Sequence, residues 1–147
     1  MNFEKEINKY CLNSVSLPNT EKYSAILGLN PSQGARSPKL WNKAYSYFKK
    51  SAEMIALDIS EENFEKLFDV LKKDPNFSGG AIAAPYKEIA AEYIFENLTK
   101  EAKSIGAINC LFRNNNGELC GTNTDGEGSL VAFQNKFGDL KNKNILI

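Results

Sequence analysis

The chain has 147 residues, 42% of them hydrophobic, which is enough for one domain with a buried core. Its 18 basic residues balance 18 acidic ones, so no net charge favours nucleic acid or a membrane surface as a partner. The sequence contains no histidine, which removes the commonest general base and most zinc sites and leaves acid–base chemistry to Lys, Asp, Glu, Tyr or Cys.

The cysteines Cys11, Cys110 and Cys120 have no Cys-x-x-Cys spacing, so neither a disulfide framework nor a metal site is expected. No apolar run approaches ~18 residues, and the N-terminus alternates acidic and basic residues. We therefore expect a soluble cytoplasmic protein whose partner is a small molecule or another protein.

The pattern along the chain alternates strands and helices, which predicts an α/β protein: a three-layer open sheet, mostly parallel, with helices on both faces and one β-hairpin. In chain order we expect a short helix over 3–11, a strand over 23–29, a loop over 30–36, a helix over 38–48 with Ser37 as its N-cap, a strand over 54–59, a helix over 60–73, a strand over 77–84, a helix over 85–95, strands over 107–112 and 119–124, a helix around 130–137 and the beginning of a strand over 144–147.

Two local patterns constrain the strands further. Glycines weaken a strand interior unless another group approaches the backbone closely, which is what Gly79-Gly80 predicts. Asn114-Asn115-Asn116-Gly117 predicts a hairpin turn, in which paired residue numbers sum to 231, or to 233 for a tighter turn. Either register puts Asn109 next to Asp125.

Polar groups gather where the predicted strands end. Lys87 lies in the first turn of a helix that follows a strand, and Gly121-Thr122-Asn123-Thr124-Asp125-Gly126 joins a strand to the last helix. Thr124 and Glu127 also have the spacing of a capping box, so helix capping explains this turn as well as a binding site does. Lys87 alone is more often a solvated helix residue.

Three segments, taken in order, resemble the shikimate dehydrogenases, and specifically their N-terminal substrate-binding domain. They are Gly28-Leu29-Asn30-Pro31 leading to Ser37-Pro38, Phe77-Ser78-Gly79 leading to Pro85-Tyr86-Lys87-Glu88, and Ile105-Gly106-Ala107-Ile108-Asn109 leading to the turn over 121–126. The resemblance implies a helical leader over 1–22, a substrate-binding domain over 23–140 and, over 141–147, the start of a linker or strand towards a nucleotide-binding domain outside this chain.

The resemblance also implies an activity, the NADP-dependent reduction of 3-dehydroshikimate to shikimate in aromatic amino acid biosynthesis by the chorismate pathway. Lys87 and Asp125 match the catalytic pair of the family, and NADP is expected to bind mainly to the domain outside this chain. The expected substrate-binding residues are Ser37 for the carboxylate and Asn109 for ring hydroxyls, together with Arg36, Tyr86 and Thr124. The expected partner is a small ring hydroxy acid, with a homodimer left open.

The chain departs from the family pattern at three polar positions. The family usually reads Ser-x-Ser-Pro where this chain has Ala35-Arg36-Ser37-Pro38, and Asn-Val-Thr-x-Pro where it has alanine at Ala81 and Ala83. Each lost hydrogen bond is expected to weaken binding of a polyhydroxy acid by ~0.5–1.5 kcal/mol. Two alternatives therefore stay open: a diverged member acting on quinate or another ring hydroxy acid, with Arg36 replacing the lost carboxylate contact, and a non-catalytic ring-acid binding or interaction domain.

Overall fold

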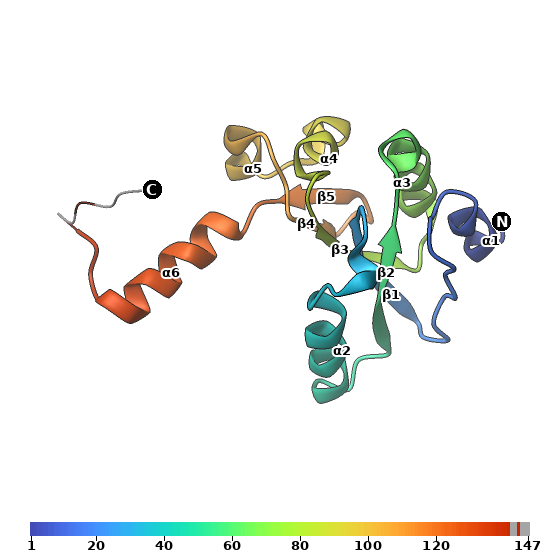
Figure 1. Cartoon of the computed structure of the whole chain (residues 1–147), viewed down its shortest axis with the longest axis horizontal. Helices are drawn as coiled ribbons and strands as arrows, with labels where there is room; N and C mark the ends of the chain where they lie inside the picture. Colours follow the sequence, from blue (N-terminus) through green and yellow to red (C-terminus); the bar gives the residue numbers. More distant parts are fainter. Residues whose placement is uncertain (142–143, 145–147) are drawn as a thin grey trace.

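The computed structural model describes residues 1–141 and Asn144. At its centre is an open five-stranded sheet in the order β2-β1-β3-β4-β5 (Figure 1). The strands are β1 (Lys22–Gly28), β2 (Ala52–Asp58), β3 (Phe77–Ile82), β4 (Cys110–Arg113) and β5 (Leu119–Thr122). β2, β1 and β3 pair in parallel, whereas β4 pairs antiparallel with both of its neighbours. The predicted α/β sheet, mostly parallel and with one hairpin, is confirmed.

Helices cover both faces of the sheet. α2 lies on one face, α3, α4 and α5 lie on the other, and α6 stands away from the sheet (Figure 1). The helical segments are α1 (Phe3–Asn8), η1 (Pro31–Gln33), α2 (Ser37–Tyr47), η2 (Glu61–Asn63), α3 (Phe64–Lys73), α4 (Lys87–Tyr93), η3 (Phe95–Asn97), α5 (Lys100–Ile105) and α6 (Asp125–Phe137). None of the helices formed by the described residues has the length and apolar character needed to cross a membrane.

The start of α2 differs from prediction. Ser37 is the first residue of this helix rather than its N-cap, and no side chain caps the helix, so the predicted cap is wrong. At the other end of the chain, the strand expected over 144–147 lies outside the described residues except for Asn144.

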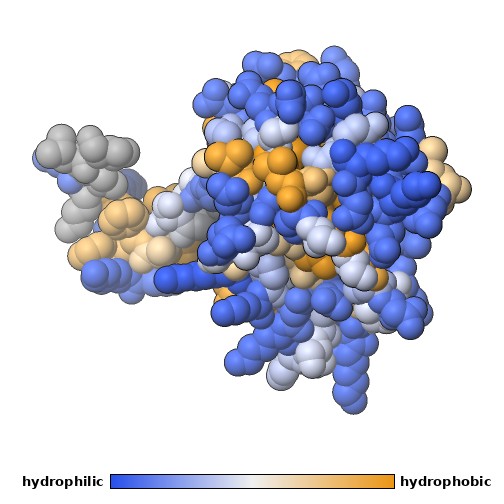
Figure 2. All heavy atoms as spheres, turned by 45° about the vertical axis from the view of Figure 1, so that its right-hand side comes forward, coloured by the Kyte–Doolittle hydropathy of each residue, from blue (hydrophilic) through white to orange (hydrophobic). Residues whose placement is uncertain are grey.

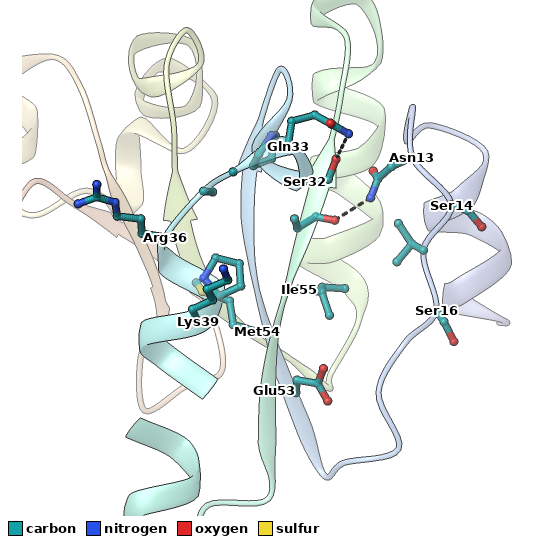
Figure 3. A pocket seen from close by; sticks show the side chains of 16 residues that line it. Asn13, Ser14, Ser16, Ser32, Gln33, Arg36, Lys39, Glu53, Met54 and Ile55 are labelled. Atoms are coloured by element: carbon teal, nitrogen blue, oxygen red, sulfur yellow. Dashed lines mark hydrogen bonds between the residues drawn. The ribbon is translucent and has the colours of Figure 1, made fainter. Parts of the chain in front are cut away.

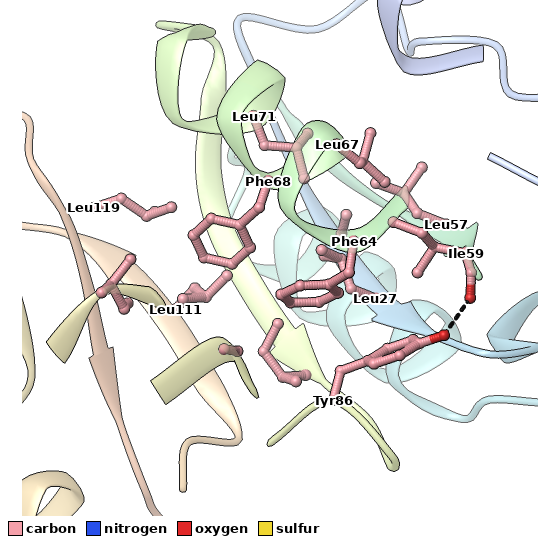
Figure 4. Packing of buried hydrophobic residues seen from close by; sticks show 14 of the residues in the cluster. Leu27, Leu57, Ile59, Phe64, Leu67, Phe68, Leu71, Tyr86, Leu111 and Leu119 are labelled. Atoms are coloured by element: carbon pink, nitrogen blue, oxygen red, sulfur yellow. Dashed lines mark hydrogen bonds between the residues drawn. The ribbon is translucent and has the colours of Figure 1, made fainter. Parts of the chain in front are cut away.

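The main core lies between the sheet and α3. The apolar stripe of α3 is fully buried (Phe64, Leu67, Phe68 and Leu71) and packs over strand residues that include Leu27, Leu57, Leu111 and Leu119 (Figure 4). Full burial of each such side chain contributes about 1.5–3 kcal/mol. Ile7 of α1 and Val15 belong to the same core, so the leader packs onto the domain.

Gly79 and Gly80 allow β3 to lie unusually close to its neighbours. A Cβ at Gly79 would overlap the carbonyl oxygen of Leu111, and one at Gly80 would overlap that of Ala25. Both glycines have positive φ, at 122° and 150°, which other residues rarely adopt. The close backbone approach predicted for this pair is confirmed.

The hairpin differs from prediction by one residue. β4 and β5 pair from Arg113 opposite Leu119 to Cys110 opposite Thr122, so paired numbers sum to 232 rather than 231 or 233. The reason is a five-residue loop in which Asn114 bonds to Glu118: its backbone N–H donates to the Glu118 carbonyl at 3.0 Å, and its Oδ1 accepts hydrogen bonds from the backbone N–H of Asn116 and of Glu118. Sequence spacing alone does not reveal a loop closed by a side chain.

Candidate functional site

Four chain segments meet at one edge of the sheet. β1 and β3 run in parallel and end together, with Leu27 opposite Ile82, and β5 runs in the same direction. The loop over 30–36 therefore leaves the sheet at the same edge as the connections to Lys87 and Asp125, and Asn109 enters β4 there. In open α/β sheets the carboxyl ends of the strands are where ligands bind.

Backbone hydrogen bonds hold three of these segments in fixed positions. The N–H of Ile108 donates to the carbonyl of Lys87 at 2.9 Å, and that of Ile82 donates to the carbonyl of Asn109 at 2.9 Å. The N–H of Asn109 in turn donates to the carbonyl of Thr122 at 3.1 Å. The first residue of α4 is thereby tied to the segment that enters β4 and to the end of β5.

Lys87 and Asp125 form an ion pair, with 2.6 Å between Nζ and Oδ2. The hydrogen bond from Lys87 lowers the pKa of Asp125 below its ordinary value; partial burial opposes this shift, and a hydrogen bond from Asn109 adds to it. The two side chains are 36% and 55% exposed. An ion pair this open contributes only ~0–1 kcal/mol to stability.

Asn109 fixes the carboxylate of Asp125. Its Nδ2 donates to Asp125 Oδ1 at 2.6 Å and to Thr124 Oγ1 at 3.0 Å, while its Oδ1 accepts from the N–H of Thr124 at 3.0 Å. The amide orientation is unambiguous because a backbone N–H only donates and a carboxylate only accepts. The predicted proximity of Asn109 and Asp125 is confirmed.

The capping box suggested by the spacing of Thr124 and Glu127 is not formed. α6 begins at Asp125, and Thr124 makes no capping hydrogen bond because its hydroxyl is bonded to Asn109. Asn123, one residue before the N-cap, bonds the first N–H of the helix instead: its Oδ1 accepts from the N–H of Asp125 at 3.0 Å, and its Nδ2 donates to the carbonyl of Ala107 at 3.1 Å. Asn123 is not among the predicted site residues, although an Asn two residues before a helix start is a known turn signal.

The predicted substrate contact by Tyr86 is wrong. Its side chain is only 2% exposed, its ring packs against Phe64 with 4.9 Å between the ring centres, and its hydroxyl donates to the carbonyl of Ile59 at 2.6 Å (Figure 4). Tyr86 is the N-cap of α4, immediately before Lys87, and its side chain lies in the core.

Arg36 and Ser37 lie on the loop that follows β1 and at the start of α2. Among the described residues, neither side chain has a hydrogen-bond partner, so both are available to a ligand. Arg36 is exposed and points away from the other residues that line a pocket of about 660 Å³ beside β2 (Figure 3). No hydrogen bond within the described chain joins them to the Lys87 and Asp125 pair.

Alanines occupy the floor between this loop and Lys87. Ala83 lies directly over the end of β1, because a Cβ placed on Gly28 would be 3.0 Å from its methyl group and 3.3 Å from Pro31. Ala81 lies in β3 between Ile26 of β1 and Cys110 of β4. These methyl groups stand where the family resemblance predicts an amide and a hydroxyl.

Gly126 and Gly128 do not form a dinucleotide-binding turn. They lie inside α6 rather than in a glycine-rich turn between a strand and a helix. Nor do residues 1–141 and 144 contain a cluster of three acidic, Cys or His side chains able to hold a metal ion.

Comparisons with known proteins identify the family of the chain. Residues 26–111 match the model of the shikimate dehydrogenase substrate-binding domain. The chain is 35% identical over 129 residues to the quinate/shikimate dehydrogenase of Escherichia coli O139:H28, covering 87% of the chain and 44% of that protein. It is 37% identical over 126 residues to the shikimate dehydrogenase (NADP+) of Methanococcus maripaludis, covering 86% and 44%.

Solved structures show the same domain. A shikimate dehydrogenase in complex with NADP+ superposes with a TM-score of 0.76 at 26% identity, over 87% of this chain and 45% of that one. The shikimate 5-dehydrogenase of Thermus thermophilus in complex with NADP(H) and shikimate gives 0.66 at 28% identity, over 78% and 42%. The chain spans less than half of the length of the curated relatives it matches. Because the family model covers more than half of its residues, the chain belongs to the shikimate dehydrogenase family and contains the substrate-binding domain.

Proposed function

We propose that this chain is the substrate-binding and catalytic-residue domain of a shikimate dehydrogenase-like oxidoreductase that acts on a ring hydroxy acid. The observation that carries the proposal is the 2.6 Å ion pair between Lys87 and Asp125 at the carboxyl edge of the sheet, oriented by Asn109. The pair is open to solvent on one side, where a small ligand has access to both groups.

This pair suits the proton transfers of ketone reduction and alcohol oxidation. Reduction of a ring ketone creates an oxyanion, to which the Lys87 ammonium supplies a proton and nearby positive charge. In the oxidative direction the neutral amine accepts the hydroxyl proton. Asp125, whose lowered pKa keeps it ionised, holds the ammonium and accepts a hydrogen bond from a ring hydroxyl.

The hydride itself requires NADP, which we propose is bound by a separate nucleotide-binding domain. α6 offers a surface for such a domain: Leu130, Phe133 and Phe137 form an exposed apolar stripe on a helix without buried residues, the arm at the left of Figure 2. Asp125 is the first residue of this helix, so a domain packed on the stripe would lie close to the catalytic pair.

The ligand is proposed to be held by its carboxylate at Arg36 and Ser37. The alanines at Ala35, Ala81 and Ala83 remove hydrogen-bond partners for ring hydroxyls, which favours a less hydroxylated or bulkier acid than shikimate. Quinate is the first alternative to test, since one relative is named a quinate/shikimate dehydrogenase. The same alanines are the main support for a second candidate function, a non-catalytic ring-acid binding domain.

Calorimetric titration with shikimate, quinate and related ring acids tests the proposal. Binding of at least one acid, weakened by Lys87→Ala and by Asp125→Asn but not by Lys66→Ala on the exposed side of α3, is the expected result. A chain that binds none of them refutes the proposal. Turnover of NADPH by a form that includes a nucleotide-binding domain, abolished by Lys87→Ala, separates the enzyme from the silent binding domain.

A further inference from the structure

The hydrogen bonds that tie the loop of Arg36 to the strands all end at one residue, Asp58. The N–H of Ser32 donates to Asp58 Oδ1 at 2.8 Å, and the hydroxyl of Ser32 donates to Asp58 Oδ2. These are the only hydrogen bonds that join residues 30–36 to a strand in the described chain. The other hydrogen bonds of the loop lie within the loop itself or lead into α2.

The burial of Asp58 has a cost in free energy. The residue is 5% exposed, it lies at the end of the edge strand β2, and among the described residues no cation forms an ion pair with it. A buried carboxylate without a cation is usually destabilising compared with an apolar side chain of similar size.

The N-terminal leader holds Asp58 from the outer side of β2. The N–H of Leu12 donates to the carbonyl of Asp58 at 2.8 Å. Asn13 spans the strand edge, because its Oδ1 accepts from the N–H of Asp58 at 2.8 Å and its Nδ2 donates to the carbonyl of Ala56 at 3.0 Å. The end of an edge strand would otherwise have free backbone groups on this side.

Within the described structure, no hydrogen bond joins the leader to the loop. They lie on opposite sides of the pocket of about 660 Å³, with Ser32 and Gln33 on one side and Ser14 and Ser16 on the other (Figure 3). The chain of contacts from Asn13 through Asp58 to Ser32 is therefore the direct connection between the leader and the loop.

We propose that Asp58, clamped by Leu12 and Asn13 of the leader, is a positioning residue that sets the loop of Arg36 and Ser37 for binding the carboxylate of the ring acid. The proposal rests on the proposed function for its ligand, but not for the ordering of the loop. In this proposal the leader keeps the carboxylate-binding loop in place without touching the ligand.

The test compares two matched buried aspartates. Asp74 is 1% exposed and, like Asp58, accepts one hydroxyl, from Tyr23 at 2.8 Å, and one backbone N–H, from Asn76 at 2.9 Å. It precedes β3 and so lies at the opposite end of the sheet. Asp58→Asn and Asp74→Asn each place an amide where a buried carboxyl group accepts one hydroxyl and one backbone N–H, and Asn13→Ala loosens the clamp alone.

Two measurements are made on each variant of the full chain. Amide hydrogen exchange at residues 33–37 reports the order of the loop without any ligand. Calorimetry compares a ring acid that the parent chain binds, shikimate or quinate, with its methyl ester, which lacks the carboxylate charge. A residue with a merely structural role would weaken the binding of the acid and of the ester alike.

We expect Asp58→Asn to speed exchange at residues 33–37 and to weaken binding of the acid about five- to twentyfold while changing binding of the ester less than twofold. Asn13→Ala should act in the same direction but more weakly, and Asp74→Asn should do neither. The proposal is overturned if Asp74→Asn speeds loop exchange equally, or if Asp58→Asn leaves the loop as protected as in the parent chain. If no ring acid binds the parent chain, the proposed function fails, and the exchange comparison alone still decides the role of Asp58.

Discussion

Tyr86 and Lys87 are adjacent in the sequence but should have opposite effects when substituted. Tyr86→Phe removes a hydroxyl that donates to the carbonyl of Ile59 at 2.6 Å in a position that is 2% exposed. The ring remains packed against Phe64. The loss of the hydrogen bond, together with the carbonyl left unpaired in the core, should lower the free energy of unfolding by about 1–2 kcal/mol. In a domain of this size, each kcal/mol lowers Tm by about 2–4 °C.

Lys87→Met should weaken binding of the ring acid and change stability little. The ion pair that it breaks is open to solvent and contributes at most ~1 kcal/mol to stability, and methionine keeps the aliphatic part of the side chain. A hydrogen bond to a charged group is, however, worth about 1.5–3 kcal/mol in a binding site. The affinity for the ring acid should therefore fall by about ten- to a hundredfold.

Urea unfolding followed by circular dichroism measures the free energy of unfolding. Calorimetric titration with the tightest-binding ring acid measures the affinity. Tyr86→Phe should bind that acid within about twofold of the parent chain. If Tyr86→Phe instead kept full stability and lost binding, the phenol would have to reach the ligand. The assignment of Tyr86 to the core would then be incorrect.

Three further outcomes test the site and the sheet. Because Lys87 lowers the pKa of Asp125, that carboxylate should stay ionised until the pH falls below its ordinary range of about 4, and Lys87→Met should move its titration, followed by NMR, to higher pH; identical titrations in both proteins would contradict the ion pair. Ala83→Thr should tighten shikimate binding by about two- to tenfold in calorimetry if the missing hydroxyl limits affinity, whereas a loss of affinity would point to a bulkier ligand. Gly80→Ala should prevent folding, seen as loss of the cooperative thermal transition, because its Cβ would overlap the carbonyl of Ala25, while Gly128→Ala in open space on α6 should leave Tm unchanged or higher.

The sequence predicts the elements whose pattern is local. The stripe of α3 has helical spacing and is followed by Asp74-Pro75-Asn76, and the structure buries all four of its apolar residues. Gly79-Gly80 is unusual enough in a strand to predict close backbone approach. The register of the hairpin is not predictable in this way, because the side chain of Asn114 closes a five-residue loop in a sequence that also suits shorter turns.

The same distinction applies to the site. The predicted closeness of Asn109 and Asp125 is confirmed although both predicted registers are wrong, since the Asn side chain reaches past the end of the hairpin to Asp125. The sequence predicts no role for Asp58. Its partners come from Asn13 and Ser32, far away in the sequence on different elements, and nothing in its local pattern distinguishes it from the end of an ordinary strand.

Asp125 depends on hydrogen bonds rather than on packing for its position. It begins a helix of 13 residues, none of which is buried against the sheet, so no core contact fixes the direction of its side chain. What fixes it are the bonds from Lys87 and Asn109 to its carboxylate and the bond from its N–H to Asn123. The hydrogen bonds therefore anchor the first residue of α6, whereas the remainder of the helix has no buried side chain that holds it to the sheet.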